Sequence, residues 1–372
     1  MSIKGPAILR EQNQKMVLSL LRRYKQTSRK DLAKLMGVSK NTVSIIVDQF
    51  MKDGMIREVG VNDLQKVGRP KILIELNAES FKAIGITISR DGLEYVVIDY
   101  YSNIIQKECY KANGRNVIEV VDSVSLIVNS LLEEFDGILG VGIGIPGIVN
   151  SVEGIVYEST KLQWKNVMML DLLKDKIEVP LFIHNNVKMA SLCSSDYEDV
   201  DTNVSSFYIR IGDGIGGAFI REGVIWDGNS WTSGEIGHIS VEPEGPICSC
   251  GQKGCLEKMI SHTTFMKWKT KFDKESFNLT PEEISGKVND LMFLYGKYLG
   301  FSLISVINIV NPGKIVIDSP YNENQMFKTT IIDFLEQNAL KIPFSNTTIH
   351  FNNKPYSQSL GAATAVILKN EN

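Results

Sequence analysis

One histidine and three cysteines fall within eighteen residues of this chain, and this cluster limits the fold more than any other feature. The four residues are His238, Cys248, Cys250 and Cys255. One imidazole and three thiolates supply the four soft ligands of a tetrahedral zinc site. Because four protein ligands leave no open position for a substrate, we expect the zinc to be structural. A redox pair or ordinary buried thiols are the alternative, which the correct spacing of a fourth ligand makes weaker.

The length and composition are those of a globular protein with more than one part. With 372 residues, 43% hydrophobic and 22% charged, the chain can form a small domain and a two-lobed body. No apolar run approaches a membrane span, and the first residues lack the apolar core of a secretion signal. The five cysteines do not follow the pattern of a secreted disulfide framework. We therefore expect a cytoplasmic protein with no membrane partner.

The charge is unevenly distributed along the chain. Residues 1–77 hold fifteen of the 40 basic residues but only seven of the 43 acidic ones, a net charge of +8 against −11 in residues 78–372. A basic N-terminal part, the head, on an acidic remainder, the body, indicates that the head binds a polyanion. A solvated basic surface is the alternative that charge alone leaves open.

The head, residues 1–77, is predicted to be a winged helix-turn-helix domain. Apolar spacing predicts helices over residues 13–24, from Thr27 or Ser28 onward, and from Ser39 to about Asp53. The third helix begins with short polar side chains, which let a helix approach base edges and phosphates closely. The helical residues expected to contact DNA are Ser28, Ser39, Lys40, Asn41, Thr42 and Ser44.

Two predicted strands, residues 55–59 and 72–76, form the wing that follows. Their loop carries Lys66, Gly68 and Arg69, which can lie along phosphates or enter a narrow minor groove. Helical hairpins also serve packing or dimerisation, so the helices alone are weak evidence. With the basic wing and the charge imbalance, we predict binding to double-stranded operator DNA.

The body, residues 78–372, alternates apolar strand patterns with helical ones, which favours an α/β fold of two lobes with a ligand cleft. The predicted strands are residues 83–88, 94–99, 140–145, 181–185, 206–211, 217–221 and 314–317. The predicted helices are residues 117–135, 169–176, 188–194, 284–309 and 323–339.

Nearly the whole chain resembles the ROK family of repressors, open reading frames and kinases. The resemblance lies in residues 234–238 and 248–257, the glycine turns 142–147 and 212–217, and residues 162–164. Because a predicted winged helix precedes the body, the chain is similar to the xylose-repressor branch of this family. The resemblance implies a sugar-kinase/actin-like ATPase fold for the body, after the winged helix. It also implies sugar-hydroxyl ligands at Asn185, Asn186, Glu235, His238 and Glu257.

The chain departs from the family's kinases at the groups that carry phosphoryl transfer. The kinases have Asp where this chain has Asn186, and an amide cannot accept a proton at neutral pH. Their first phosphate loop, Asp-x-Gly-Gly-Thr, is replaced around Thr87, Ser89 and Arg90, and their adenosine-side Gly-Gly by Asp318-Ser319. Only the glycine turn 212–217 remains, which is weak evidence alone. We expect no catalytic residues and no enzyme activity.

The predicted function is a sugar-responsive repressor. A small sugar or oligosaccharide would change the closure of the lobes in a homodimer, and so the spacing of its two DNA-reading heads. Whether dimers pair further stays open. Two alternatives remain: an active sugar kinase with an appended DNA reader, and a DNA-binding scaffold whose body only dimerises. Xylose is one candidate effector by branch resemblance, and glucose or a glucose-containing oligosaccharide is equally compatible with the motif.

Overall fold

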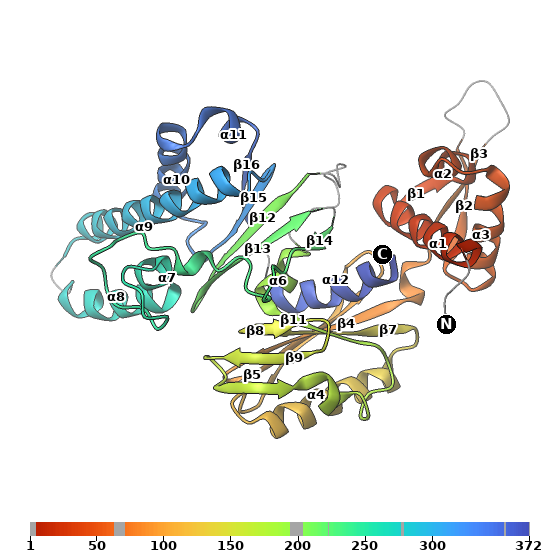
Figure 1. The fold of residues 1–372 in the computed structure, drawn as a ribbon, viewed down its shortest axis with the longest axis horizontal. Coiled ribbons are helices and arrows are strands. Elements are labelled where there is room, and N and C mark those ends of the chain that lie inside the picture. The colour runs from red at the N-terminus through yellow and green to blue at the C-terminus, as the bar shows by residue number, and fades with distance from the viewer. Residues whose placement is uncertain are drawn as a thin grey trace. The chain divides into compact units, whose positions relative to one another are not determined.

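The computed structural model describes residues 5–62, 71–193, 204–221, 223–276, 279–352 and 355–371, without the side chains of Pro6, Val61 and Asn62. The chain divides into two compact units, which are described separately below (Figure 1). The first unit is Met1–Val200 with Tyr356–Asn372, and the second is Asp201–Pro355.

The first unit begins with a three-helix winged fold, as predicted. Its strands pair antiparallel in the order β1-β3-β2, and the helices pack on them through Leu21, Leu32, Val47 and Ile74, all fully buried. The first helix starts at Gly5 rather than Asn13, because its opening turns are exposed and show no apolar face. The elements are α1 (Gly5–Tyr24), β1 (Gln26–Ser28), α2 (Arg29–Met36), α3 (Lys40–Lys52), β2 (Ile56–Asn62) and β3 (Lys71–Leu76).

A five-stranded mixed sheet follows in the same unit, in the order β11-β7-β4-β5-β6. Alternate residues of β4 face opposite ways: Ile84 and Ile86 join the core around helix α4, while Ala83 joins the core around α12. The sheet therefore lies between these two helices (Figure 1). The elements are β4 (Lys82–Ser89), β5 (Gly92–Asp99), β6 (Ile104–Lys111), α4 (Val117–Glu134), β7 (Ile138–Ile145), β11 (Leu181–Asn185), α6 (Asn186–Ser191) and α12 (Ser357–Glu371).

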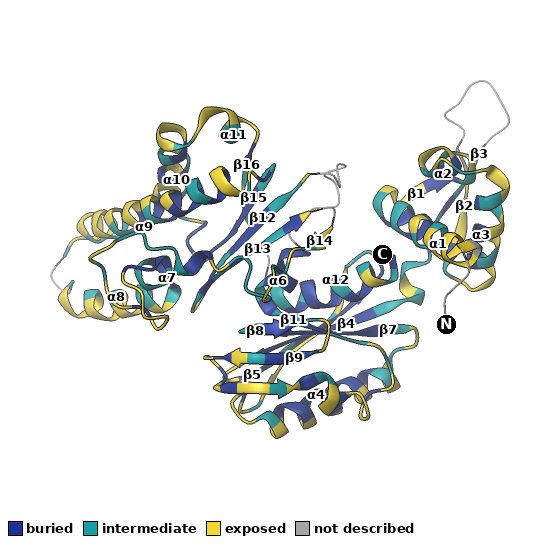
Figure 2. Ribbon diagram, in the orientation of Figure 1, coloured by how far each residue is buried: buried dark blue, intermediate teal, exposed yellow. Residues whose placement is uncertain are grey.

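Helix α12 lies directly on the backbone of this sheet. A side chain at Gly85 would come within 1.9 Å of the Ser359 carbonyl, and one at Gly142 within 1.9 Å of the Ala362 carbonyl. Glycine at both positions allows this close approach. Most of α12 is consequently buried (Figure 2). A small antiparallel sheet completes the unit, formed by β8 (Ile148–Asn150), β9 (Ile155–Ser159) and β10 (Trp164–Met168), with α5 (Met169–Leu173) after it.

The second unit is built on another five-stranded sheet, in the order β14-β13-β12-β15-β16. The core residues Phe207 and Ile209 of this sheet join one cluster with Leu299 and Leu303 of helix α9. The strands are β12 (Ser206–Ile211), β13 (Ile215–Arg221), β14 (Val224–Ile225), β15 (Lys314–Asp318) and β16 (Thr348–Asn352). The helices are η2 (Ile236–His238), α7 (Leu256–Ile260), α8 (His262–Glu275), α9 (Pro281–Ile309), α10 (Gln325–Asn338) and α11 (Lys341–Ser345).

Among the described helices only α9 has the length and apolar composition to cross a membrane. Packing accounts for that composition, because Leu299, Leu303 and Ile307 are fully buried in the core of the second unit. The helix also begins with a capping box between Thr280 and Glu283, which is typical of globular proteins. We therefore describe α9 as a core helix.

Candidate metal, sugar and DNA sites

The predicted metal ligands converge on one point in the second unit. The ligand atoms of His238, Cys248, Cys250 and Cys255 all lie within 4.8 Å of one another. The two sulfurs of Cys250 and Cys255 are 3.6 Å apart, and the Cys248 sulfur is 3.6 Å from His238 Nδ1. Sulfurs around zinc with bonds of about 2.3 Å lie roughly 3.8 Å apart in a tetrahedron. The donor set and its spacing therefore fit a divalent metal ion.

Backbone bonds fold the cysteine loop into this shape. The Cys248 amide donates to the Gln252 carbonyl at 2.8 Å, and the Gly251 amide donates to the Cys248 carbonyl at 2.9 Å. The Leu256 amide donates to the Ile239 carbonyl at 2.9 Å, which brings Cys255 beside His238. The cluster is thus set by local turns.

The thiols differ in how easily they ionise. Burial raises the pKa of Cys255 to about 12, and its sulfur neighbours add to the effect, because they disfavour a second negative charge. The pKa of exposed Cys250 is lowered, first by a hydrogen bond from the backbone of Gln252. A bound divalent cation would supply the positive charge that a buried thiolate needs.

The same region carries three of the predicted sugar ligands, and His238 is also one of the metal-cluster residues. His238 turns Nδ1 toward Cys248, while its Nε2 lies 4.0 Å from a Glu235 carboxylate oxygen. Glu257 lies in the first turn of α7, two residues after Cys255, and its carboxylate accepts a hydrogen bond from the Ile215 amide at 2.9 Å. His238 can therefore bind a metal ion through one ring nitrogen and a sugar hydroxyl through the other.

The other two predicted sugar ligands lie in the first unit, where β11 meets α6. Asn185 caps α6: its side-chain oxygen accepts from the amides of Val187 and Lys188, and its nitrogen donates to the Gly147 carbonyl. The helix consequently starts at Asn186 rather than Lys188, and it ends at Ser191, while Ser194 lies outside the described residues. Within the described chain no hydrogen bond involves the Asn186 side chain, so this amide is available to a ligand.

At the position of the kinases' first phosphate loop, the side chains of this chain form hydrogen bonds within the protein. Thr87 donates its hydroxyl hydrogen bond to the Gly144 carbonyl at 3.3 Å, and Ser89 donates to the Gly92 carbonyl at 3.0 Å. At the adenosine-side position, Asp318 accepts hydrogen bonds from Arg210, at 2.6 Å, and from the hydroxyl of Tyr208. Side chains rather than glycine occupy both places.

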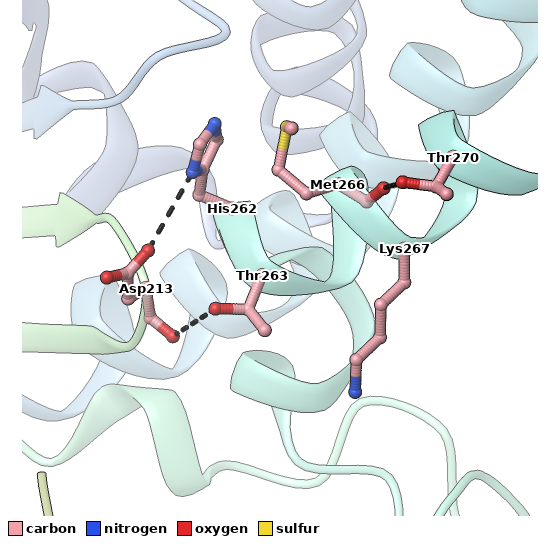
Figure 3. A pocket seen from close by; sticks show the side chains of 6 residues that line it. All are labelled: Asp213, His262, Thr263, Met266, Lys267 and Thr270. Atoms are coloured by element: carbon pink, nitrogen blue, oxygen red, sulfur yellow. Dashed lines mark hydrogen bonds and ion pairs between the residues drawn. The ribbon is translucent and has the colours of Figure 1, made fainter. Parts of the chain in front are cut away.

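The remaining glycine turn borders a shallow pocket that sequence reasoning missed (Figure 3). The pocket has a volume of about 390 Å³. At its edge the His262 ring lies 3.8 Å from the Asp213 carboxylate, and Thr263 donates to the Asp213 carbonyl at 3.2 Å. Its lining comes from this turn and α8, and consists of Asp213, His262, Thr263, Met266, Lys267 and Thr270.

In the head, the first turns of α3 present most of the residues predicted to contact DNA. Lys40 and Asn41 are exposed, and Thr42 and Ser44 are half-buried. Ser39 caps the helix, since its hydroxyl accepts from the Thr42 amide at 3.1 Å. Asn41 and Ser44 lie on the side of α3 away from its buried apolar stripe, while Ser39 and Lys40 are exposed at its N-terminal end.

Ser28 does not fit the expected DNA contacts. Its side chain is buried and caps α2, accepting from the Asp31 amide at 3.2 Å and donating to the Asp31 carboxylate at 2.6 Å. We therefore assign Ser28 to helix capping. The wing residues Lys66, Gly68 and Arg69 lie outside the described residues.

A ROK family model matches residues 83–371 of the chain. The chain belongs to the ROK family. A MarR family model matches residues 11–59, within the winged helix. The xylose repressor of Bacillus subtilis is 27% identical over 326 residues, covering 85% of this chain and 84% of that protein. The transcriptional dual regulator NagC of Escherichia coli is 24% identical and covers 96% of this chain and 93% of its own length.

Solved ROK structures confirm the fold. A ROK family transcriptional regulator, described as a homologue of the E. coli MLC protein, superposes with a TM-score of 0.82 at 21% identity, covering 98% of this chain and 96% of its own. A ROK hexokinase from Thermus thermophilus superposes with a TM-score of 0.63 at 20% identity, covering 78% of this chain and 99% of its own. The winged helix followed by a sugar-kinase-like α/β body is therefore the fold of this ROK protein.

Proposed function

We propose that this ROK protein is a sugar-responsive transcriptional repressor of the cytoplasm. One observation carries the proposal: a winged helix precedes a ROK body in which α6 begins with the amide of Asn186 instead of a carboxylate. Because an amide cannot take the proton of a sugar hydroxyl, sugar bound there remains unchanged. Relatives that span most of the chain are named as repressors, which agrees with this reading.

The DNA-reading part in this proposal is residues 1–77, and residues 78–372 form the sugar-binding part. The first turns of α3 enter the major groove of operator DNA, with Lys40 near phosphate and Asn41 near base edges. Exposed Ile45 on the same helix offers an apolar contact for a thymine methyl group. The wing residues Lys66, Gly68 and Arg69 add contacts along the backbone. Two copies bind as a homodimer, which matches paired half-sites.

The effector in this proposal is held through its hydroxyl groups. Asn186, Glu235, His238 and Glu257 supply the donors and acceptors. Asn185 positions Asn186 through the cap of α6. Zinc at the His238 and cysteine cluster is structural, because it fixes the loop from which Glu235 and Glu257 project.

Helix α12 offers a path from the sugar-binding amide to the DNA-reading head. At one end a side chain at Gly361 would come within 2.0 Å of the Met189 carbonyl, so α12 packs directly on α6. At the other end Glu371 forms an ion pair with Arg22 of α1 at 2.7 Å. We propose that a shift of α6 on sugar binding reaches the head along this rigid helix.

A second candidate, an active sugar kinase, is favoured by the glycine turn 212–217 and the adjoining pocket. A coupled assay of ATP consumption separates the two functions. We expect no turnover of glucose or xylose, and sugar-dependent ADP formation by contaminant-free protein would overturn the repressor proposal. Asn186→Asp is the matched variant, since it restores the carboxylate without changing size.

Operator binding tests the proposal directly. DNA selected by the purified protein from a random-sequence pool is titrated with the full chain at several salt concentrations, with and without a panel of sugars. We expect Lys40→Ala to weaken binding to all sequences and to lower the salt slope by about 1. Lys267→Ala, a charge-matched change in the second unit, should have no effect. A DNA affinity unchanged by every sugar at saturation would contradict the proposal.

A further inference from the structure

The loop that leads into the sugar motif carries two tryptophans. Trp226 and Trp231 lie within six residues of each other, and the chain then runs directly into Gly234 and Glu235. Trp226 is 58% exposed, and Trp231 is half-buried. A large aromatic side chain left open to solvent beside a ligand motif is typical of a binding surface.

This loop is closed on itself. The Ser233 amide donates to the Asp227 carbonyl at 3.2 Å, and the Ser233 hydroxyl donates to the Trp226 carbonyl. The Trp226 amide donates to the Phe219 carbonyl at 2.9 Å, which ties the start of the loop to β13. The backbone that presents both tryptophans is therefore well fixed.

Trp231 is held in the left-handed backbone region, at φ 57°. A bulky residue is an outlier there, because its Cβ crowds the backbone. Glycine would adopt this conformation without strain, so the backbone alone does not call for tryptophan at this position. Backbone strain of this kind concentrates at ligand-binding segments.

The tryptophan loop and the sugar motif lie along one face of β13. On this face Ile215 lies against Gly237 of the motif, and a Cβ added at Gly217 would lie 3.0 Å from the Gly234 carbonyl. Phe219 is the next residue of β13 on the same face. The Phe219 ring packs edge-on against Trp226, with centroids 6.1 Å apart and planes at 89°. Two residues of a strand span about 6–7 Å. The contact of Phe219 with Trp226 thus lies about 6–7 Å along β13 from the contact of Gly217 with Gly234, a spacing close to the length of one sugar ring.

We propose that Trp226 and Trp231 stack on a second sugar ring, so that the effector is an oligosaccharide of at least two units. One face of a pyranose ring presents C–H groups and is apolar, and it packs well on the flat face of an indole. Glu235, His238 and Glu257 hold the first ring by its hydroxyls, so the inference rests on the proposed function.

Calorimetric titration of the metal-loaded full chain tests this proposal with xylose against xylobiose and with glucose against cellobiose. We expect the matching disaccharide to bind about tenfold more tightly than its monosaccharide, since an aromatic stack adds that much. Trp226→Ala and Trp231→Gly should remove this advantage and leave monosaccharide affinity unchanged. Binding of the disaccharide should also quench tryptophan fluorescence in the wild type.

Two variants control for folding and for a general effect of removing tryptophan. Trp231→Gly suits the local backbone, so its loss of disaccharide affinity is not a loss of fold. Trp268→Phe removes a tryptophan of α8, stacked on Phe272 at 4.7 Å, and should leave the disaccharide preference intact.

Two results would overturn the inference alone: no preference for either disaccharide, or an equal loss of monosaccharide and disaccharide affinity in both loop variants. Failure of every sugar to bind the wild type would instead overturn the proposed function, and this inference with it.

Discussion

Two polar clusters hold parts of the chain together, one across a long stretch of sequence and one within a single loop, and they differ in what completes them. Arg22 of α1 and Glu371 of α12 form an ion pair whose side chains are only 4% and 2% exposed. The cluster around Cys255 gathers one imidazole and three thiols within 4.8 Å. The first cluster contains both of its charges. The second contains only candidate ligands, and in our proposal a metal ion from solution completes it.

The difference shows what makes two parts of the protein rigid: the attachment of the DNA-reading head and the sugar-binding loop. The head shares an apolar core with α12, and its attachment includes a buried charge pair, which is costly to break because one charge is left alone. In our proposal the loop that carries Glu235 and Glu257 depends on the free energy of metal binding. The head should therefore stay attached in the presence of a chelator, while the sugar loop should not stay ordered.

Loss of the metal should have the largest effect. Cys255→Ser, or treatment with a strong chelator, should cost several kcal/mol, since structural zinc contributes on the order of 10 kcal/mol in small domains. Differential scanning fluorimetry with metal analysis measures this, and we expect one zinc per chain. Cys109→Ser, at an exposed cysteine outside the cluster, is the control. A metal-free Cys255→Ser protein with the melting temperature of the wild type would refute the structural role.

Breaking the ion pair between Arg22 and Glu371 should have the second largest effect on stability. Arg22→Ala leaves the buried carboxylate of Glu371 without its partner and should lower the free energy of unfolding by about 3–5 kcal/mol. The double variant Arg22→Met with Glu371→Leu should be nearly neutral, because apolar side chains of similar volume fill the same space. Urea denaturation followed by circular dichroism measures both. A double variant as unstable as the single one would mean that packing, and not charge, fixes this contact.

The pH dependence of the same pair should be smaller. Burial raises the pKa of Glu371 to about 6, against an ordinary value of 4.5. Because the folded state binds this proton more tightly than the unfolded state, the contribution of Glu371 to stability is present below pH 4.5 and is lost as the pH rises through 6. The loss should reach about 2 kcal/mol. Denaturation midpoints between pH 4.5 and 7 should show it in the wild type and not in Glu371→Gln.

The smallest expected effect is a gain in stability. Trp231→Gly relieves a left-handed backbone at a bulky residue and should stabilise the protein by about 1 kcal/mol, or a few degrees in melting temperature. Trp226→Ala is the comparison, because the backbone of Trp226 has no positive φ to relieve. If Trp231→Gly were destabilising, the indole would have a packing role that outweighs its backbone strain.

Local chemistry made much of this protein predictable. Ser39 was expected to cap a helix and does so, and the strand over 181–185 was expected with the bounds that it has. The four metal ligands followed from residue type and spacing, and they meet in space as expected. By contrast α12 was missed: its small residues, such as Ala362 and Ala363, give no one-sided apolar pattern, because the helix is buried on several sides.

The sequence by itself determined the family, the order of the winged helix and the ROK body, and the candidate metal ligands, since each depends on residue types at short spacings. Only the tertiary structure decided that Arg22 meets Glu371, 349 residues further along the chain, that the side chain of Ser28 is buried, and that Trp231 has a left-handed backbone. The reason is physical. Burial, pairing over long sequence distances and backbone strain are properties of the packed chain, and the local sequence does not carry them.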